Sequence, residues 1–357
     1  AAKCMTEVNL QSVLCQYGIT AAHTTKISGG LINSTWKVND QQKEYILQQI
    51  NTHVFSDPHL IAANTQLLKK HLKTIGSEYL LVAEIPTFSG ELIVQEGADC
   101  FRLLPFVRSS TTISIVETPA QAYEAAYQFG LFTKLFSDLD ATLLNTTIPQ
   151  FHDLSLRYTQ FFDALKNGNR KRIDACKREI ATVDAYAYLV DEWQQFVSSS
   201  EARRRVTHHD TKISNVLFGE ADQGLCVIDL DTVMPGFFIS DVGDMMRTYL
   251  SPASEEEADY SKLRVRRAFF EAVAQGYLTN MADALTLFEL QSFTKSGVWL
   301  TYMQALRFLT DYFTDDRYYG ARYEQQNLVR ANNQLMLLSD FLAHEDQFQS
   351  FVMHNFR

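Results

Sequence analysis

The sequence lacks the features that several common protein classes require. It contains five cysteines, Cys4, Cys15, Cys100, Cys176 and Cys226, and no two of them form a Cys-x-x-Cys pair. An odd and widely spaced set argues against a disulfide framework and against a cysteine-based zinc site. The chain also has no run of about 18 apolar residues, so the sequence predicts no membrane-spanning helix and no membrane partner.

Concentrated positive charge is also absent. The formal net charge is -10, and the lysines and arginines are scattered, with short clusters such as Arg203-Arg204-Arg205. An acidic chain without a basic stripe argues against nucleic acid as a main partner. The first ten residues lack the basic start and the long apolar stretch of a secretory signal. We therefore expect a cytoplasmic protein, and we expect it to be a monomer or a weak homodimer.

Apolar and aromatic residues, in contrast, are abundant. Hydrophobic residues make up 46% of the 357 residues, and they include 24 Phe and 16 Tyr. This composition supports a large buried core and argues against disorder. The length exceeds that of one ordinary domain, so we expect two.

The N-terminal part of the chain predicts a β-rich lobe. Short extended runs separated by turn residues predict strands, and two segments have helical spacing. Asp57 and Pro58 form a typical helix start, with Asp57 as the cap and Pro58 at the first helical position. The predicted strands cover residues 23–28, 34–38, 44–50, 91–95 and 100–104, and the predicted helices cover 6–17 and 58–75.

After Pro105 and a connecting segment at 106–112, the chain becomes mainly helical. A strand-rich island at 204–231 interrupts the helices. Because strands and helices do not alternate, we predict an α+β fold with a β-rich N-terminal lobe at 1–107 and a helical C-terminal lobe at 108–357. A ligand site between the lobes is then expected. The predicted helices cover 119–138, 153–166, 176–198, 257–278, 286–314 and 326–344.

The strand-rich island carries the residues best suited to chemistry. Asp210 lies five residues before Asn215, which is followed by an apolar strand, a turn at 220–224 and a second apolar strand ending at Asp229. Pairing of the two strands would bring Asp229 beside Asn215, where one oxygen of each can hold a hard cation such as Mg²⁺. Asp210 would remain free to accept a proton from an acceptor hydroxyl. Asp231 is either a supporting residue of the metal site or a turn residue.

This order of residues is that of the protein-kinase catalytic loop. The segments VTHHDTKISNVLF at 206–218 and VIDLDTVMPG at 227–236 resemble the aminoglycoside phosphotransferase and choline kinase superfamily. Together with YILQQIN at 45–51 and RFLTDY at 307–312, they are similar to its N-acetylhexosamine 1-kinase group. The resemblance extends over nearly the whole chain.

The resemblance implies a bilobal protein-kinase-like fold that uses ATP and Mg²⁺ to phosphorylate the anomeric hydroxyl of GlcNAc or GalNAc. It implies that Asp210 is the base and that Lys212 lies near the transferred phosphoryl group. Asn215 and Asp229 would hold the magnesium ion. The implied contacts with the sugar acceptor come from Arg307, Tyr318, Asp231 and Asn33. From the residues alone, Arg307 can instead pair with Asp311 four positions later, and a lone tyrosine is often a packing residue.

The nucleotide would lie between the lobes. Gly29 and Gly30 suit a turn over the phosphates, although no GxxxxGK[ST] loop is present. Gln48 stands on the third strand, where kinase-like folds have a lysine, and backbone groups near Phe106 and Val107 would meet the adenine. His208 is expected to hold the catalytic loop in place.

Several points leave the acceptor open. Leu31 and Gln326 stand where the sugar kinases have histidines, so the hexosamine itself is not fixed. The alternative is a kinase of an aminoglycoside, choline or ethanolamine, homoserine or a thiosugar. A cationic acceptor would need acids such as Asp311, Asp315, Asp316 and Glu324. A non-catalytic nucleotide- or sugar-binding protein is a further alternative. We interpret Asp241 as a helix N-cap.

Overall fold

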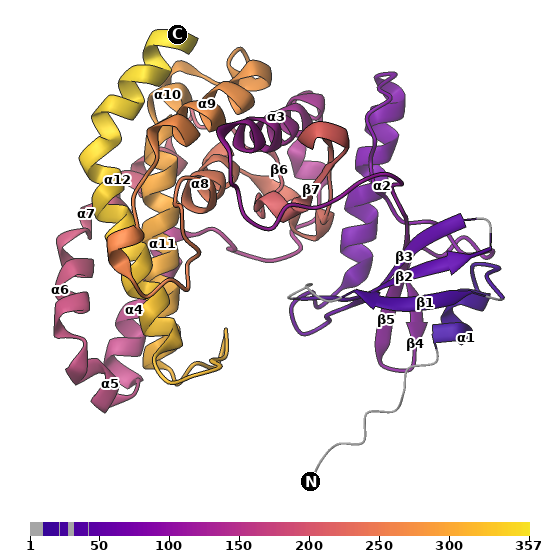
Figure 1. Cartoon of the computed structure of the whole chain (residues 1–357), viewed down its shortest axis with the longest axis horizontal. Helices are drawn as coiled ribbons and strands as arrows, with labels where there is room; N and C mark the ends of the chain where they lie inside the picture. Colours follow the sequence, from indigo (N-terminus) through magenta and orange to yellow (C-terminus); the bar gives the residue numbers. More distant parts are fainter. Residues whose placement is uncertain (1–9, 21, 28–31, 42) are drawn as a thin grey trace.

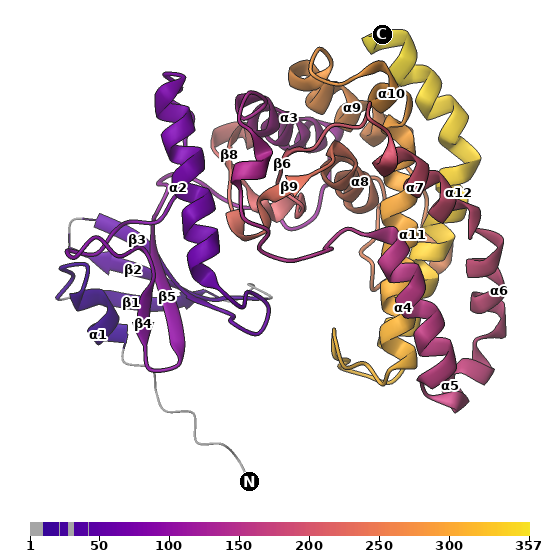
Figure 2. The same cartoon turned by 180° about the vertical axis from the view of Figure 1, so that it is seen from behind.

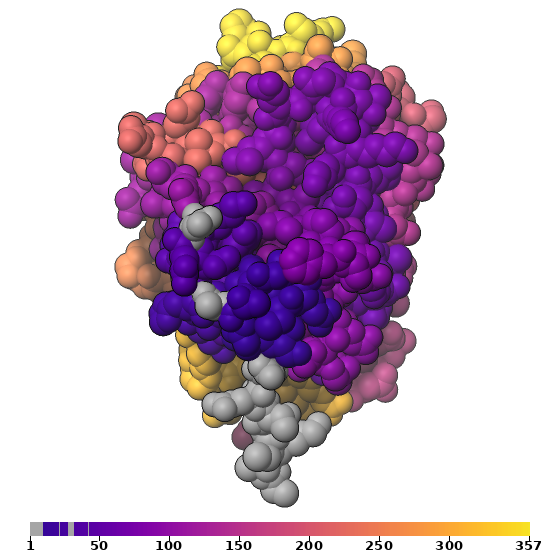
Figure 3. Space-filling view, turned by 90° about the vertical axis from the view of Figure 1, so that its right-hand side faces the viewer, coloured from indigo at the N-terminus to yellow at the C-terminus, as the bar shows by residue number. Residues whose placement is uncertain are grey.

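The protein folds into two lobes joined by an extended connection (Figure 1). The structure is a computed structural model, and it describes residues 10–20, 22–27, 32–41 and 43–357. Figure 3 looks onto the N-terminal lobe, whose indigo-to-purple surface covers much of the helical lobe behind it. The predicted α+β class and bilobal kinase-like architecture are therefore confirmed. In the part of the chain that is described, no helix has the length and hydropathy needed to cross a bilayer.

A five-stranded antiparallel sheet forms the N-terminal lobe, with the strand order β1-β2-β3-β5-β4. Val38 of β2, Leu47 of β3 and Phe101 of β5 are fully buried and pack with Val13 of the short helix α1. The elements are α1 (Leu10–Cys15), β1 (His23–Ile27), β2 (Ser34–Asp40), β3 (Lys43–Ile50), α2 (Pro58–Thr74), β4 (Val94–Glu96) and β5 (Asp99–Pro105).

Helix α2 lies between the sheet and the helical lobe (Figures 1 and 2). It begins as predicted, because the Asp57 side chain accepts a hydrogen bond from His59 N. Its Ile61 belongs to a cluster of the N-terminal lobe, whereas Leu68 and Leu72 belong to the core of the helical lobe. The helix therefore contributes apolar residues to both lobes, and the predicted boundary at residue 107 does not separate two independent cores.

The helical lobe packs around long helix pairs. Helix α3 runs along α9 and helix α11 along α12. Gly130 on α3 and Gly276 on α9 make the first pairing close, because an added Cβ would lie 2.7 Å from Tyr277 O or 2.4 Å from Tyr123 O. The helices are α3 (Pro119–Leu135), α4 (Leu154–Asn167), α5 (Arg170–Ala175), α6 (Lys177–Ala185), α7 (Tyr188–Ser198), α8 (Phe238–Tyr249), α9 (Arg267–Met281), α10 (Leu287–Gln291), α11 (Phe293–Phe313) and α12 (Gln326–Phe356).

The predicted strand-rich segment of the C-terminal lobe consists of four short strands and short 3₁₀ turns. Strand β6 pairs with β9, and β7 pairs with β8, so the predicted hairpin is confirmed. The elements are β6 (Arg205–Thr207), η2 (Ile213–Asn215), β7 (Val216–Phe218), η3 (Glu220–Asp222), β8 (Gly224–Val227), η4 (Leu230–Thr232) and β9 (Met234–Gly236), and the remaining 3₁₀ turns are η1 (Ala141–Leu143) and η5 (Tyr260–Lys262).

Some predicted helix limits are wrong. The segment 176–198 forms α6 and α7, which are separated at Tyr186 and Ala187. The segment 286–314 is divided at Ser292 into α10 and α11. The helix predicted from 257 begins only at Arg267, because the Arg266 side chain donates to carbonyl groups at the end of α8 and holds the preceding segment as a loop. Helix α12 continues past 344 because Phe348 and its neighbours remain in the core.

Asn64 of α2 is a buried polar link between α2 and the helical lobe. Its side chain is 1% exposed. Nδ2 donates to Asn145 O at 2.8 Å and to Val233 O at 3.0 Å, and Oδ1 accepts from Asn145 N at 2.7 Å. The asparagine thus satisfies backbone groups that would otherwise be buried without partners.

We expect Asn64→Ala to lower the free energy of unfolding by about 2–3 kcal/mol, since it leaves buried backbone donors and acceptors unsatisfied. Urea denaturation followed by circular dichroism measures the change. Asn355→Ala, at an exposed position of α12, is the matched control and should change the stability by less than about 0.5 kcal/mol. Equal effects of the two substitutions would contradict this role of Asn64.

Candidate active site

The catalytic loop is held by His208, as the sequence predicted. The imidazole is buried, its Nδ1 accepts from Asp210 N at 3.3 Å, and its Nε2 lies 2.9 Å from Ile228 O. Because Nδ1 accepts, the proton is on Nε2, which donates to Ile228 O. Burial lowers the pKa of His208, so the neutral ring fits this role. His208 thereby ties the loop that carries Asp210 to the end of β8.

Asp241 holds the same loop from helix α8. Its carboxylate accepts from His208 N at 3.0 Å and from His209 N at 2.7 Å. One turn later, Asp244 accepts from Thr211 N at 3.0 Å. The N-cap interpretation of Asp241 is therefore wrong: α8 begins at Phe238, and the carboxylate points to the catalytic loop. Two acids three residues apart on one helix face were the sequence signal for this role.

Asp210 and Lys212 form an ion pair at the accessible end of the loop. Lys212 Nζ lies 2.8 Å from Asp210 Oδ2, and the two side chains are 38% and 24% exposed. Burial lowers the pKa of Lys212, but the charges of Asp210 and Asp229 outweigh burial, and the net effect raises it. Lys212 therefore remains cationic beside two carboxylates, in a position suited to a phosphoryl group.

The β7–β8 hairpin places Asp229 beside Asn215. Ile228 N donates to Asn215 O at 2.8 Å, and Val216 pairs with Val227. The Asn215 side chain is nearly buried, and its Nδ2 donates to Asp210 O at 2.9 Å. This bond uses the amide nitrogen and leaves Oδ1 to accept a cation.

The environment of Asp229 fits a divalent cation. Desolvation by the surrounding protein raises the pKa of Asp229 to about 7, and the negative charges of Asp231 and Asp210 add to this effect. The side chain of Asp229 is nevertheless exposed to solvent. Within the described residues, no three His, Cys, Asp or Glu groups gather closely enough to hold a metal alone. Two protein oxygens, completed by water and phosphate oxygens, are nevertheless a common way to hold Mg²⁺. Asn215 and Asp229 can supply these two.

Asp231 joins the lobes. It is 2% exposed, its Oδ1 lies 2.5 Å from Arg102 Nη2, and its Oδ2 accepts from Asn33 Nδ2 at 2.8 Å. Asn33 in turn accepts from Asn51 N at 2.9 Å. Asp231 and Asn33 are thus bonded to each other, and their predicted contact with the acceptor stays a prediction.

Arg102 is a residue of the site that the sequence analysis missed. It lies on β5 and donates to Gln48 Oε1 of β3 through Nε at 3.0 Å and Nη2 at 2.8 Å. Gln48, the predicted substitute for the strand lysine, therefore orients an arginine on the neighbouring strand. The sequence signal was an arginine inside an otherwise apolar strand, where a buried charge requires a partner.

The remaining nucleotide predictions are not tested. Gly29 and Gly30, with Leu31, lie outside the described residues. In the connection between the lobes, Phe106 N donates to Glu44 O at 3.4 Å, and Val107 O accepts from the Ser110 hydroxyl at 2.6 Å. These contacts shape the segment expected to meet the adenine.

Arg307 and Tyr318, the two predicted acceptor contacts from the C-terminal lobe, lie beside each other. Arg307 Nη2 lies 3.4 Å from the Tyr318 hydroxyl, and the guanidinium lies 5.7 Å from the centre of the Phe151 ring. Tyr318 is 71% exposed, so it is not a core packing residue. The alternative pairing of Arg307 with Asp311 is wrong, because Asp311 is buried and accepts from the backbone N–H groups of Tyr318 and Tyr319 in the α11–α12 loop.

Aromatic rings connect this pair to the catalytic loop. Phe151 stacks on His152 at 4.6 Å, and His152 lies 5.6 Å from His209, the residue before Asp210. Burial, followed by His209 and Arg307, lowers the pKa of His152 far below its usual value. The α11–α12 loop, residues 314–325, extends toward the side of the N-terminal lobe (Figure 2). A series of ring contacts thus links Arg307 to His209, the residue before Asp210.

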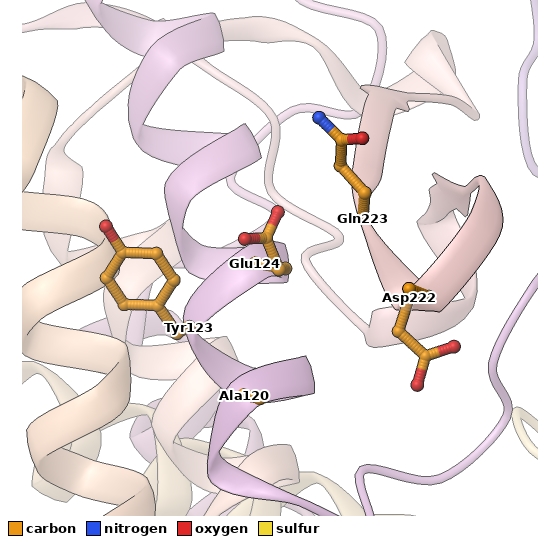
Figure 4. Close-up of a pocket in the computed structure, with 6 residues that line it drawn as sticks. Ala120, Tyr123, Glu124, Asp222 and Gln223 are labelled. Atoms are coloured by element: carbon orange, nitrogen blue, oxygen red, sulfur yellow. The ribbon is translucent and has the colours of Figure 1, made fainter.

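A separate pocket of about 360 Å³ lies between α3 and the β7–β8 turn. Figure 4 shows the Glu124 carboxylate facing the turn that carries Asp222. Glu124 accepts from Gly224 N, and Asp222 accepts from Gln121. The pocket lies at the opposite end of the hairpin from Asn215 and Asp229, and its acids are used within the protein, so we do not place the reaction there.

Comparison with known proteins gives a family match. The model of the phosphotransferase enzyme family, APH, matches residues 23–287. A microcompartment-associated aminopropanol kinase is similar at 16% identity and a TM-score of 0.67, over 94% of this chain and 97% of that chain. A spectinomycin phosphotransferase with ADP and spectinomycin is similar at 12% identity and a TM-score of 0.64, over 97% of this chain and 100% of that chain.

A Plasmodium vivax ethanolamine kinase is also similar, at 13% identity and a TM-score of 0.56, over 92% of this chain and 83% of that chain. At these identities the likeness to solved structures supports the fold. The family match covers the catalytic loop, the hairpin and the residues that join the lobes. The names of these relatives include amino alcohol and aminoglycoside kinases, so the N-acetylhexosamine acceptor stays a prediction.

We expect the buried His209 to make stability depend on pH. Burial lowers the pKa of His209 to about 4. The unfolded chain, with an ordinary histidine pKa near ~6.5, therefore binds the proton first, and stability falls as the pH drops from about 6.5 to about 4. The slope contributed by this residue reaches about 1.4 kcal/mol per pH unit.

His209→Asn tests this dependence, because asparagine tolerates the φ of 67° at this position and does not titrate. The free energy of unfolding, measured by denaturant at pH 7, 6 and 5, should fall less steeply in the variant than in the wild type. Parallel pH profiles would show that His209 is not the source of the slope.

Proposed function

This chain is an enzyme of the phosphotransferase enzyme family that acts on a hydroxyl acceptor, and we propose that it transfers the γ-phosphoryl group of ATP to the anomeric hydroxyl of an N-acetylhexosamine, GlcNAc or GalNAc. The observation that carries the proposal is the convergence of Asp210, Lys212, Asn215 and Asp229 at one end of the β7–β8 hairpin. These residue types in this arrangement match the division of roles in phosphoryl transfer by kinases.

In the proposed reaction, Asp210 orients the acceptor hydroxyl and accepts its proton as the oxygen attacks phosphorus. Lys212, 2.8 Å from Asp210, balances charge on the transferred group. Asn215 and Asp229 would hold Mg²⁺, which supplies positive charge to the phosphate oxygens. Burial and the neighbouring acids raise the pKa of Asp229 to about 7, so a divalent cation bound there would favour its ionised form.

The charge of the acceptor side supports a neutral acceptor. The buried Asp311 accepts hydrogen bonds from backbone N–H groups, Asp315 accepts one from Asn169, and Asp316 forms an ion pair with Arg172. These acids are therefore engaged within the helical lobe. Among the described residues, no carboxylate forms an ion pair with Arg307. Its unpaired positive charge favours an acceptor that presents hydroxyl or carbonyl oxygens and disfavours one that presents an ammonium group.

A kinase of an amino alcohol or an aminoglycoside is the second candidate. The observation in its favour is that the similar structures include an aminopropanol kinase, a spectinomycin phosphotransferase and an ethanolamine kinase. Such an acceptor would place its ammonium group near Glu324 or another exposed acid, because the carboxylates of Asp311 and Asp316 already bind groups of the protein. The two candidates differ in acceptor charge, which an activity assay separates.

We expect ADP release to depend on GlcNAc or GalNAc when the enzyme is supplied with ATP and Mg²⁺. A coupled assay with GlcNAc, GalNAc, galactose, aminopropanol, ethanolamine, choline, homoserine and kanamycin measures the preference. Activity with the cationic compounds alone would refute the sugar assignment and support the second candidate.

Asp210→Asn is the control for the chemistry in this assay. It should reduce kcat by about 10²–10⁴-fold, the usual contribution of a general base, and leave ATP binding nearly unchanged. Wild-type turnover in this variant would remove Asp210 from the proposed role.

Arg307→Met tests the acceptor contact separately. Loss of hydrogen bonds to a charged group should raise KM for the preferred acceptor by about 10–100-fold. KM for ATP should not change, because Arg307 lies on the acceptor side. Arg317→Met, exposed on the same loop, is the matched control and should keep both KM values. An unchanged acceptor KM in Arg307→Met would place the acceptor elsewhere.

A further inference from the structure

Arg102 is a buried cation at the junction of the lobes. Its side chain is 3% exposed and contacts three partners from different segments. Gln48 accepts two of its hydrogen bonds, Glu84 Oε1 lies 3.4 Å from Nη1, and Asp231 Oδ1 lies 2.5 Å from Nη2. The guanidinium donates hydrogen bonds to Gln48 and Glu84, and its contact with Asp231 Oδ1 is an ion pair without a hydrogen bond. An ammonium group in its place would be a point charge.

The contact with Asp231 reaches the metal-binding turn. Asp231 lies in η4, two residues after Asp229, and both of its carboxylate oxygens are held by residues of the N-terminal lobe, Arg102 and Asn33. The distance along the chain between Asp231 and Asp229 is too short for one to move freely while the other is fixed. The position of Asp231 therefore limits the conformations available to Asp229.

Asp229 has a backbone conformation that needs such support. Its φ is 62° and its ψ is 64°, in the left-handed region that residues other than glycine adopt uncommonly, although aspartate adopts it more readily than most. A residue stays in this region only when its surroundings hold it there. On the N-terminal side of Asp229, Ile228 is held by Asn215 and His208. On the other side, Asp231 contacts Arg102 and Asn33, and the next residue, Thr232, donates its hydroxyl to His208 O at 2.7 Å.

We propose that Arg102 is the positioning residue of the metal-binding turn: by holding Asp231 from strand β5, it keeps Asp229 in the conformation that binds the divalent cation of the nucleotide. This inference rests on the proposed use of Mg²⁺ and ATP. It assigns to an arginine on the fifth strand a role at the phosphate site, where Gln48 stands in place of a strand lysine. The metal site is then complete only when the sheet is seated against the helical lobe.

The direction in which the Mg²⁺ requirement changes in Arg102→Met distinguishes a positioning role of Arg102 from a purely electrostatic one. Arg102→Met removes a positive charge near Asp229, so charge alone predicts that the variant needs less Mg²⁺. Loss of positioning predicts the opposite. We expect the Mg²⁺ concentration for half-maximal binding of adenylyl imidodiphosphate, a non-hydrolysable ATP analogue, to rise about tenfold in calorimetric titrations, a change of about 1.4 kcal/mol.

Arg102→Lys keeps the charge but not the fork, and it should give an intermediate rise. It also keeps the test valid if Arg102→Met fails to fold. Arg205→Met is the matched control, because Arg205 forms a buried ion pair with Glu289 at 2.6 Å and donates its hydrogen bonds to Glu289, Arg203 and Ala284. That variant should lose stability and keep the wild-type Mg²⁺ requirement.

The outcomes separate this inference from the proposed function. If the wild type shows no Mg²⁺-dependent binding of the analogue, the proposed function fails. If the wild type binds it and the Mg²⁺ requirement of Arg102→Met or Arg102→Lys is unchanged or lower, only the positioning role fails. A similar rise in Arg205→Met would also overturn it, since the effect would then follow from general loss of stability.

Discussion

The site depends on one backbone hydrogen bond, from Ile228 N to Asn215 O, that closes the open end of the β7–β8 hairpin. This bond joins two segments that the chain separates by a strand, a turn and a second strand. It sets the amide of Asn215 and the carboxylate of Asp229 at the same end of the hairpin. His208 then bonds to the other polar group of Ile228 and adds the loop of Asp210 to the same unit. Three reactive side chains thus share one small rigid frame.

Around this frame, buried charges are arranged in pairs. Asp241 and Asp244 support the loop from α8, and Arg247 pairs with Asp244 at 2.9 Å. Asp231 pairs with Arg102 across the lobes. Removing one partner from such a pair costs more than the pair contributes, because the other charge stays buried. Among the described residues, Asp241 has no cationic partner, and burial raises its pKa to about 7, so it acts on the loop through its hydrogen bonds to backbone N–H groups.

The sequence predicted what is encoded locally. Asp57 and Pro58 predicted the start of α2, and the order of residues from Asp210 to Asp229 predicted the β7–β8 hairpin. The roles assigned to Asp210, Asn215 and Asp229 stay predictions. The two lobes also followed from the order of strands and helices. The resemblance to a kinase family was confirmed at the family level, whereas the sugar acceptor was not decided by it.

The sequence could not predict contacts between distant segments. Asn33 and Asp231 are 198 positions apart, and no local pattern connects them. Arg102 looked like an isolated charge in an apolar strand, and its partners emerge only when β3, β5 and η4 meet. Asp241 was misjudged for a similar reason: a carboxylate near a helix start suits an N-cap, and only the packing of α8 against the catalytic loop shows its real partners.

The apolar residues of helix α2 have a consequence for dissecting the enzyme. Leu68 and Leu72 are buried in the helical lobe although they precede the connection between the lobes. A fragment ending near residue 107 would expose these leucines to water, and the C-terminal fragment would have a cavity in its core where the two leucines normally pack. The two fragments should therefore aggregate when they are expressed separately and fold when they bind each other. This property would suit a split reporter.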